Sequence, residues 1–229
     1  MRSLIRGILL TGTFAVVTGC ATTPAPEPTF QTGPDAEVTV DGLVRVDNAA
    51  VPVVYRKPGI DLTPYTRFML DPVEVAYQTD PRGVTSAGMG GSQSNFALTS
   101  RQMENFRGSF EEAVVEALTE NDGYELTTEP GPGVLRITAA LIDLVVSVPT
   151  QQGGRQDSYT RSYGLVTLVL ELRDSQSGEI FARAADRRDP TRNISGNLAR
   201  VSPAMARADT QRMFEHWAQL LRERLDALK

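Results

Sequence analysis

The side chains able to do acid–base chemistry are few in this sequence. His216 is the only histidine, so sites that need two histidines are excluded, and a Ser-His-Asp triad would have to use this residue. Its neighbour Trp217 falls on the apolar stripe of a predicted helix, which favours a surface position for His216. Glu112 and Glu116 are spaced i, i+4 and share a helical face, but that face lies away from the apolar stripe and indicates a solvated surface. We therefore predict that the protein is not an enzyme and has no catalytic residue and no metal site.

A glycine-rich segment could hold a phosphate group. Residues 88–92 (GMGGS) have the glycines of a phosphate-binding loop but lack the Lys-Ser or Lys-Thr pair that completes the motif. They also lack the final glycine of a G-x-S-x-G nucleophile elbow. Residues 79–98 as a whole are rich in glycine and serine, which is typical of a long flexible loop. We expect no cofactor.

A single thiol follows an N-terminal segment with the features of an export signal. Arg2 and Arg6 precede an apolar stretch that is shorter than the about 20 residues needed to span a bilayer. Cys20 comes next and is the only cysteine. The motif Val17-Thr18-Gly19-Cys20 resembles the lipobox of bacterial lipoproteins. The resemblance implies that residues 1–19 are a lipoprotein signal peptide and that Cys20 becomes the acylated N-terminus, with a diacylglyceryl group on its thiol and fatty acids such as palmitate as its acyl chains.

The lipid anchor also predicts a location. Ala21 follows Cys20, in place of the aspartate that retains many such lipoproteins in the inner membrane. By resemblance to those sorting rules, we expect an outer-membrane protein that faces the periplasm. Residues 20–36 are rich in proline and threonine, which predicts a lipidated N-terminus and a disordered tether. Loss of Arg2 and Arg6 with the signal peptide changes the net charge from −5 to −7, and this acidic balance disfavours nucleic-acid binding.

Residues 37–229 are expected to form a single domain with two helices. Thr99 followed by Gln102 matches a capping box, and apolar residues spaced three and four apart continue this helix to a stop at residues 121–123 (NDG). Glycine is the expected left-handed residue at that stop. A second apolar stripe predicts a helix over residues 203–228.

About five strands are expected in the same domain. They lie at residues 65–77, 124–129, 134–148, 162–173 and 179–186, and the last two form an antiparallel hairpin. Pro72 interrupts the first of these runs and indicates an edge or a bulge. Residues 37–55 hold short apolar pieces that are either edge strands or a strap. The order predicts a two-layer α+β fold, with a mixed, mostly antiparallel sheet and both helices packed on one face.

The basic residues gather at one place in the sequence. Arg183, Arg187, Arg188 and Arg192 are interleaved with two aspartates, and mixed charge of this kind is typical of a salt-bridged surface. Our hypothesis is that these four arginines form an interaction surface for lipid headgroups or for an acidic partner.

Four segments together carry a family resemblance. They are residues 57–65 (KPGIDLTPY), 70–75 (LDPVEV), 129–136 (EPGPGVLR) and 170–175 (LELRDS). In this order they resemble a family of uncharacterised proteobacterial lipoproteins, domain of unknown function 3313, over about residues 40–190. The resemblance implies no activity that any residue could inherit.

These observations lead to three functional hypotheses. The first is a non-enzymatic, periplasm-facing envelope lipoprotein that is anchored in the membrane and acts as an accessory module for an envelope protein partner. The second is a carrier that binds a small ligand or a lipid in an apolar groove between sheet and helices, with residues 79–98 as a lid. The third is a hydrolase.

Overall fold

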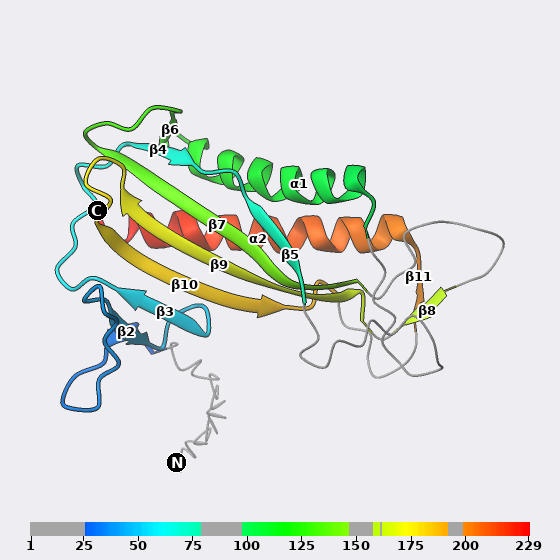
Figure 1. Cartoon of the computed structure of the whole chain (residues 1–229), viewed down its shortest axis with the longest axis horizontal. Coiled ribbons are helices and arrows are strands. Elements are labelled where there is room, and N and C mark those ends of the chain that lie inside the picture. Colours follow the sequence, from blue (N-terminus) through cyan, green and yellow to red (C-terminus); the bar gives the residue numbers. More distant parts are fainter. Residues whose placement is uncertain (1–25, 79–97, 147–157, 161, 192–198) are drawn as a thin grey trace, which may run out of the picture.

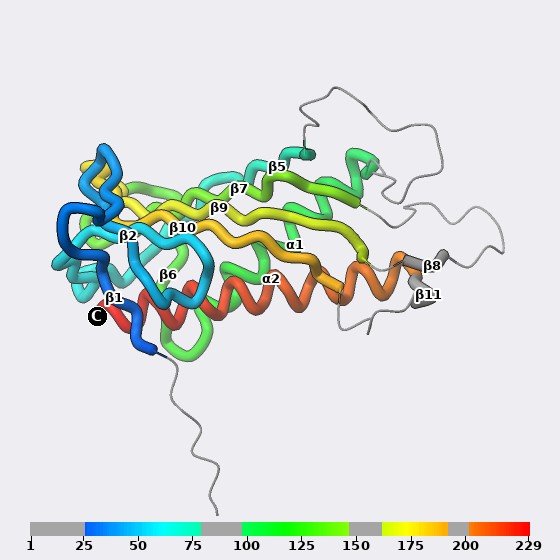
Figure 2. The backbone as a smooth tube through the Cα atoms, turned by 90° about the horizontal axis from the view of Figure 1, so that it is seen from below, coloured from blue at the N-terminus to red at the C-terminus, as the bar shows by residue number. Residues whose placement is uncertain are grey.

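Two helices cover one side of a long, twisted sheet (Figure 1). The computed structural model describes residues 26–78, 98–146, 158–160, 162–191 and 199–229. Within these residues the sheet has nine strands in the order β1-β2-β3-β10-β9-β7-β4-β6, with β5 beside β7. A view turned by 90° shows the sheet close to edge-on, with α2 running along one side of the strands (Figure 2). The predicted α+β class with a mixed sheet and two helices is confirmed, whereas the expected number of about five strands is too low.

Both helices begin with the caps that their sequences provide. α1 (Ser100–Thr119) has the predicted capping box, in which the Thr99 side chain accepts from the Gln102 backbone N–H and the Gln102 side chain accepts from the Thr99 N–H. α2 (Pro203–Asp226) starts with proline after Ser202, whose hydroxyl accepts from the backbone N–H of Met205. Such caps satisfy N–H groups that have no partner within the helix.

The end of α1 differs from the prediction. The left-handed residues are Asn121 and Asp122, with φ of 51° and 55°, and not Gly123. Gly123 is required for another reason, because a Cβ there would lie 2.2 Å from the Arg222 guanidinium and from the carbonyl of Leu118. Arg222 donates from Nη1 to that carbonyl at 2.9 Å. The glycine therefore permits close packing of the end of α1 against α2.

The centre of the sheet is β7 (Val134–Val146), β9 (Gly164–Asp174) and β10 (Ile180–Arg188). The predicted hairpin is confirmed, since β9 and β10 pair antiparallel with Ala184 opposite Leu170. Leu168, Leu170 and Leu172 are buried while their neighbours in β9 are half-buried. This period of two places alternate residues on the helix side of the sheet, and the others on its open side.

The sheet is parallel on the other side of β7. β4 (Arg67–Leu70) and β5 (Glu74–Tyr77) both pair parallel with β7, and β6 (Glu125–Leu126) pairs parallel with β4. The expected strand over residues 65–77 is thus divided near Pro72, which has no N–H to donate. The next N–H, that of Val73, leaves the ladder and donates to a carboxylate oxygen of Glu111 on α1 at 3.1 Å.

Three short strands extend the sheet beyond β10. They are β1 (Thr29–Phe30), β2 (Val44–Asp47) and β3 (Val53–Arg56). The predicted tether over residues 20–36 is therefore wrong at its end, because Thr29 and Phe30 pair with β2. A separate pair, β8 (Ser158–Thr160) and β11 (Ala199–Val201), forms a two-stranded sheet.

One hydrophobic cluster joins the helices to the sheet. Phe214 of α2 is 0% exposed and contacts Phe106 and Phe110 of α1 edge to face, with ring centroids 5.1 and 5.4 Å apart. It also stacks on Trp217 at 6.1 Å. Neither described helix is sufficiently apolar along its length to span a membrane. The core is thus a helix-on-sheet interface with aromatic rings at its centre.

Candidate functional site

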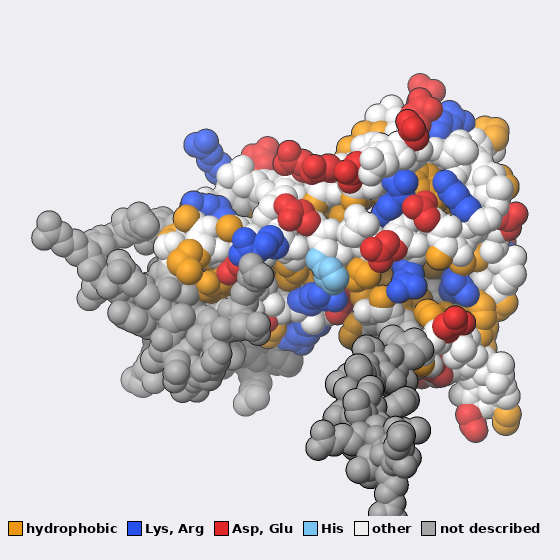
Figure 3. All heavy atoms as spheres, turned by 180° about the vertical axis from the view of Figure 1, so that it is seen from behind, with side chains coloured by type: hydrophobic (Ala, Val, Ile, Leu, Met, Phe, Trp, Pro, Cys, Tyr) orange, Lys and Arg blue, Asp and Glu red, His pale blue; other side chains and the backbone are white. Residues whose placement is uncertain are grey.

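The acid–base candidates lie on the solvent side of the helices. His216 on α2 and Glu112 and Glu116 on α1 are all exposed, and the space-filling view of the helix side shows the histidine at the surface (Figure 3). Their predicted surface positions are confirmed. Across the described residues, no group of three His, Cys, Asp or Glu side chains could hold a metal ion. Cys20 and its lipobox, residues 79–97 and Arg192 lie outside the described residues.

The predicted arginine surface is divided by the sheet. Arg183 contacts Glu171 and Asp41 on the open side, whereas Arg188 donates to Asp186, which is buried on the helix side. Arg183 and Arg188 therefore lie on opposite faces, because strand residues alternate between the two faces, and an interaction surface made of all four arginines stays a prediction.

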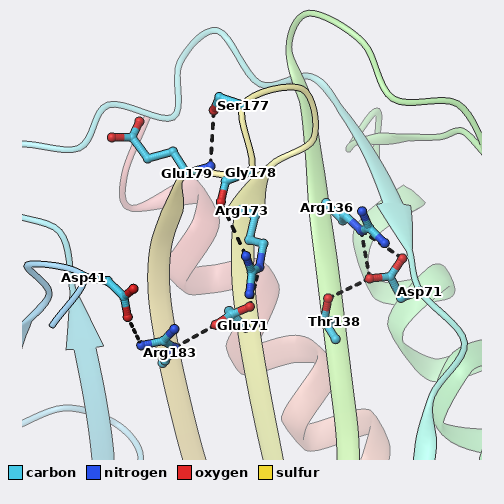
Figure 4. A network of polar contacts seen from close by, with 10 residues as sticks. All are labelled: Asp41, Asp71, Arg136, Thr138, Glu171, Arg173, Ser177, Gly178, Glu179 and Arg183. Atoms are coloured by element: carbon cyan, nitrogen blue, oxygen red, sulfur yellow. Dashed lines mark hydrogen bonds and ion pairs between the residues drawn. The ribbon is translucent and has the colours of Figure 1, made fainter. Parts of the chain in front are cut away.

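The charge of Arg183 is already neutralised by a polar network on the open face (Figure 4). Its Nε donates to Glu171 at 2.7 Å, its Nη1 donates to Asp41, and Glu171 also accepts from Arg173. This arrangement connects strands β9 and β10 with the turn that holds Asp41. It is typical of a structural surface and not of a free anion-binding site.

A second part of the open face holds Asp71 (Figure 4). Arg136 donates to its carboxylate from Nε at 2.9 Å, and Thr138 donates from Oγ1 at 2.7 Å. Burial by itself raises the pKa of Asp71, but the hydrogen bonds from Arg136 and Thr138, with the nearby positive charge, outweigh it and hold the pKa below its usual value.

The low pKa of Asp71 predicts a pH-dependent effect on stability. A lowered pKa in the folded state gives stability that is present above the unfolded pKa of about 3.9 and is lost as pH falls through the folded value. Asp71→Asn is expected to destabilise by about 1 kcal/mol at pH 7, since the half-exposed Arg136 is screened by solvent. The difference from wild type should shrink below about pH 4. Urea unfolding across this pH range measures it, and a difference that grows on acidification would contradict the assignment.

An apolar cleft lies between α2 and the helix side of β10, β3 and β2, and we call it the α2 cleft. Its volume is about 310 Å³. Ala182 and Ala184 of β10 present small side chains toward α2, at positions paired with the core-facing Leu172 and Leu170. Large side chains at these two positions would fill the space. The remaining walls are mostly aliphatic and include Val46, Val51, Val54, Leu168, Leu170, Leu172, Leu220, Leu221, Leu225 and Leu228.

Two arginines of this cleft have positive charges that are not paired. The Nε of Arg56 is buried and has no hydrogen-bond partner in the described part of the chain, and its guanidinium lies 4.6 Å over the Phe30 ring. Burial lowers the pKa of Arg56. Arg224 of α2 also lines the cleft and is exposed, with no ion pair among the residues described.

The acidic side chain in the cleft wall, that of Asp186, already has hydrogen-bond partners. Asp186 is 5% exposed and accepts from Trp217 Nε1 at 2.8 Å and from Arg188 Nε at 2.5 Å. Trp217 itself lines the cleft. The negative charge of Asp186 is therefore neutralised within the wall, and the cleft as a whole is apolar with a positive side.

A second cleft lies at the other end of α2 and has a volume of about 510 Å³. Its walls mix apolar residues such as Phe106 and Val166 with polar residues such as Asn105 and Gln211. Phe214 lines this distal cleft, and its stacking partner Trp217 lines the α2 cleft. The aromatic centre of the core thus lies between the two.

Sequence reasoning offered an apolar groove between sheet and helices as an alternative, but it named none of the residues that line the α2 cleft. The signal was the pair of alanines at positions 182 and 184, on the inward-facing side of a strand whose hairpin partner carries leucines. No sequence pattern indicated that Arg56 lines the cleft. Its position depends on the pairing of β3 with β10, and these two strands are far apart in sequence.

Comparison with known proteins gives a family but no activity. The family model described as a protein of unknown function (DUF3313) matches residues 40–221. The search of curated proteins finds no match.

The solved structures that match this chain are distant from it. The PelC dodecamer from Paraburkholderia phytofirmans is 11% identical with a TM-score of 0.36, over 74% of this chain and 96% of that chain. Protein XCC0632 from Xanthomonas campestris is 10% identical with a TM-score of 0.39, over 76% and 94%. Hypothetical protein CT253 from Chlamydia trachomatis is 10% identical with a TM-score of 0.35, over 70% and 98%. We transfer neither assembly nor function from these proteins.

Proposed function

The chain belongs to the DUF3313 family of proteins of unknown function, and from that premise we propose that it is a non-enzymatic, lipid-anchored binding domain of the cell envelope. In this proposal Cys20 carries the lipid, the anchor lies in the outer membrane, and the domain faces the periplasm as an accessory module of an envelope complex. The observation that carries the proposal is the α2 cleft, because a largely apolar cleft with a few polar groups is typical of a binding site.

The position of the cleft supports a role close to the membrane. Pro28 lines the cleft and lies eight residues after Cys20. A fully extended chain covers about 3.3–3.6 Å per residue, so a lipid on Cys20 would hold the cleft within about 28 Å of the bilayer. Several acyl chains give stable anchoring where one chain would be marginal.

A second candidate function is a carrier for a small apolar ligand. The specific observation that favours it is again the α2 cleft, whose volume of about 310 Å³ lies at the lower end of the range of about 300–1,000 Å³ for small-molecule sites. The two candidates differ in whether a protein partner is needed.

Membrane fractionation tests the anchor. We expect wild-type protein in the outer-membrane fraction with an acylated Cys20 in the mass spectrum of its N-terminal peptide. The Cys20→Ala variant should carry no acyl groups, and no mature protein should be found in the outer-membrane fraction. Ala21→Asp should move the protein to the inner membrane, while the matched control Ala21→Ser should leave it in the outer membrane. An unmodified Cys20 in the wild-type protein would overturn the anchoring proposal.

Crosslinking in intact cells tests the accessory role. A tagged protein is crosslinked, the envelope is solubilised gently, and the proteins that co-purify are identified. An envelope partner recovered in stoichiometric amount with wild type and lost with Cys20→Ala supports the accessory role. Recovery of the protein alone in both cases would contradict that role and favour the carrier.

A further inference from the structure

We propose that the α2 cleft binds a long-chain fatty acid, with its alkyl chain between α2 and the sheet and its carboxylate at Arg56 and Arg224. The inference rests on the proposed function, since it names the ligand class of the same cleft. It follows from three features: the apolar walls, the unpaired positive charges and the size of the cleft.

The walls are suited to an alkyl chain. Leucines of β9 and α2 face one another across Ala182 and Ala184, so a chain that enters the cleft removes apolar surface from water on all sides. Each buried CH₂ group contributes about 0.8 kcal/mol to transfer from water. The volume of about 310 Å³ suits one chain better than a lipid with two.

The charged residues that line the α2 cleft favour a ligand with an anionic headgroup. Four charged residues line the cleft, but Asp186 is paired with Arg188, and Arg183 is paired with Glu171 and Asp41. Arg56 and Arg224 are left, so the charges of the cleft lining that remain unpaired among the described residues are both positive and favour an anionic group. A guanidinium with a buried Nε that has no partner gains a charge-assisted hydrogen bond when a carboxylate arrives.

The burial of Arg56 Nε also favours a small headgroup. The atom is buried and the Phe30 ring covers the guanidinium plane at 4.6 Å. A flat carboxylate pairs with the edge of a guanidinium through two parallel hydrogen bonds and needs little room to do so. The bulkier headgroup of a phospholipid would have to stay outside. This distinguishes a fatty acid from a single-chain phospholipid.

The only tryptophan makes the test specific. Trp217 is the single tryptophan of the chain and lines the cleft, and bromine quenches indole fluorescence only at short range. The probe is dibromostearate, added to the full chain in nanodiscs of unbrominated phosphatidylcholine. We expect saturable quenching that stearate reverses and that stearyl alcohol, which has the same chain without the charge, does not.

Variants separate the headgroup from the chain. The double variant Arg56→Gln/Arg224→Gln is expected to weaken binding about tenfold or more. The matched control Arg101→Gln/Arg187→Gln removes the same charge from two exposed positions and should bind as wild type does. Ala184→Leu should abolish quenching by filling the cleft while both arginines remain. Thermal unfolding of each variant establishes that it is folded.

The results of these experiments show which molecule occupies the α2 cleft. The proposal is supported if dibromostearate quenches both the acylated wild type and Cys20→Ala, and if the double variant Arg56→Gln/Arg224→Gln loses this quenching. If Cys20→Ala is quenched and the acylated wild type is not, the protein's own acyl chain fills the cleft. That result would overturn the proposal. Tighter binding of palmitoyl lysophosphatidylglycerol than of stearate, equal displacement by stearyl alcohol, or no quenching at all would also overturn it. The mass of the acylated N-terminus, measured on the same sample, reports separately on the anchor.

Discussion

Replacing Phe214 by alanine is expected to lower the free energy of unfolding by about 3–5 kcal/mol. Phe214 is 0% exposed and contacts Phe106, Phe110 and Trp217. Truncation removes the apolar contacts of the ring and leaves a cavity where α1 and α2 meet the sheet. Because two of these contacts are edge-to-face aromatic pairs, the loss exceeds what the buried area alone would give.

Urea unfolding followed by circular dichroism measures this effect. The matched control is Met205→Ala, which truncates a large apolar side chain of the same helix that is 50% exposed and should change stability by about 0.5 kcal/mol or less. Equal losses in the two variants would show that Phe214 is not at the centre of the core. Because Phe214 stacks on Trp217, which lines the α2 cleft, its loss should also weaken dibromostearate quenching.

Replacing Asp186 by alanine is expected to cost about 2–3 kcal/mol. The buried carboxylate accepts from the indole N–H of Trp217 and pairs with Arg188. Its removal leaves the buried indole N–H without this acceptor. Arg188 contributes less to the loss, since its side chain is 32% exposed and can be hydrated, which keeps the cost below that of a fully buried ion pair.

Asp186→Asn distinguishes the two interactions. Asparagine keeps a side-chain oxygen for Trp217 but loses the charge that attracts Arg188, so it should destabilise less than alanine does. Urea unfolding gives the order of stability, and the emission of Trp217 should change with alanine and less with asparagine. Equal losses with asparagine and alanine would show that the ion pair with Arg188, and not the indole hydrogen bond, stabilises this wall of the cleft.

The two predictions concern the same feature of the molecule. Phe214 and Trp217 are one helical turn apart on α2 and stack on each other, and Asp186 fixes Trp217 against β10. Trp217 and Asp186 line the α2 cleft, and the buried Phe214 packs against Trp217. Changes there should therefore affect both stability and ligand binding, while changes in Arg56 and Arg224 should affect binding alone.

The sequence by itself determined the elements whose signals are local. The capping box at Thr99 and Gln102 and the apolar stripe of α2 are read from residues three or four apart, so both helices were predicted close to their observed bounds. The hairpin of β9 and β10 was also predicted, because its turn and both its strands are contiguous. The positions of His216, Glu112 and Glu116 followed from the same helical period.

Only the tertiary structure decided the features that depend on long-range pairing. Strands β1 to β3 are too short for a periodic signal, and the place of β3 beside β10 is fixed by pairing with residues about 130 positions away. That pairing places Arg56 opposite Ala182 of β10, in the cleft that Arg224 also lines. The same strand geometry separates Arg183 from Arg188 on opposite faces of the sheet. Proximity in sequence suggested one basic surface, whereas the alternation of side chains along a strand produced a salt-bridged face and a separate cleft.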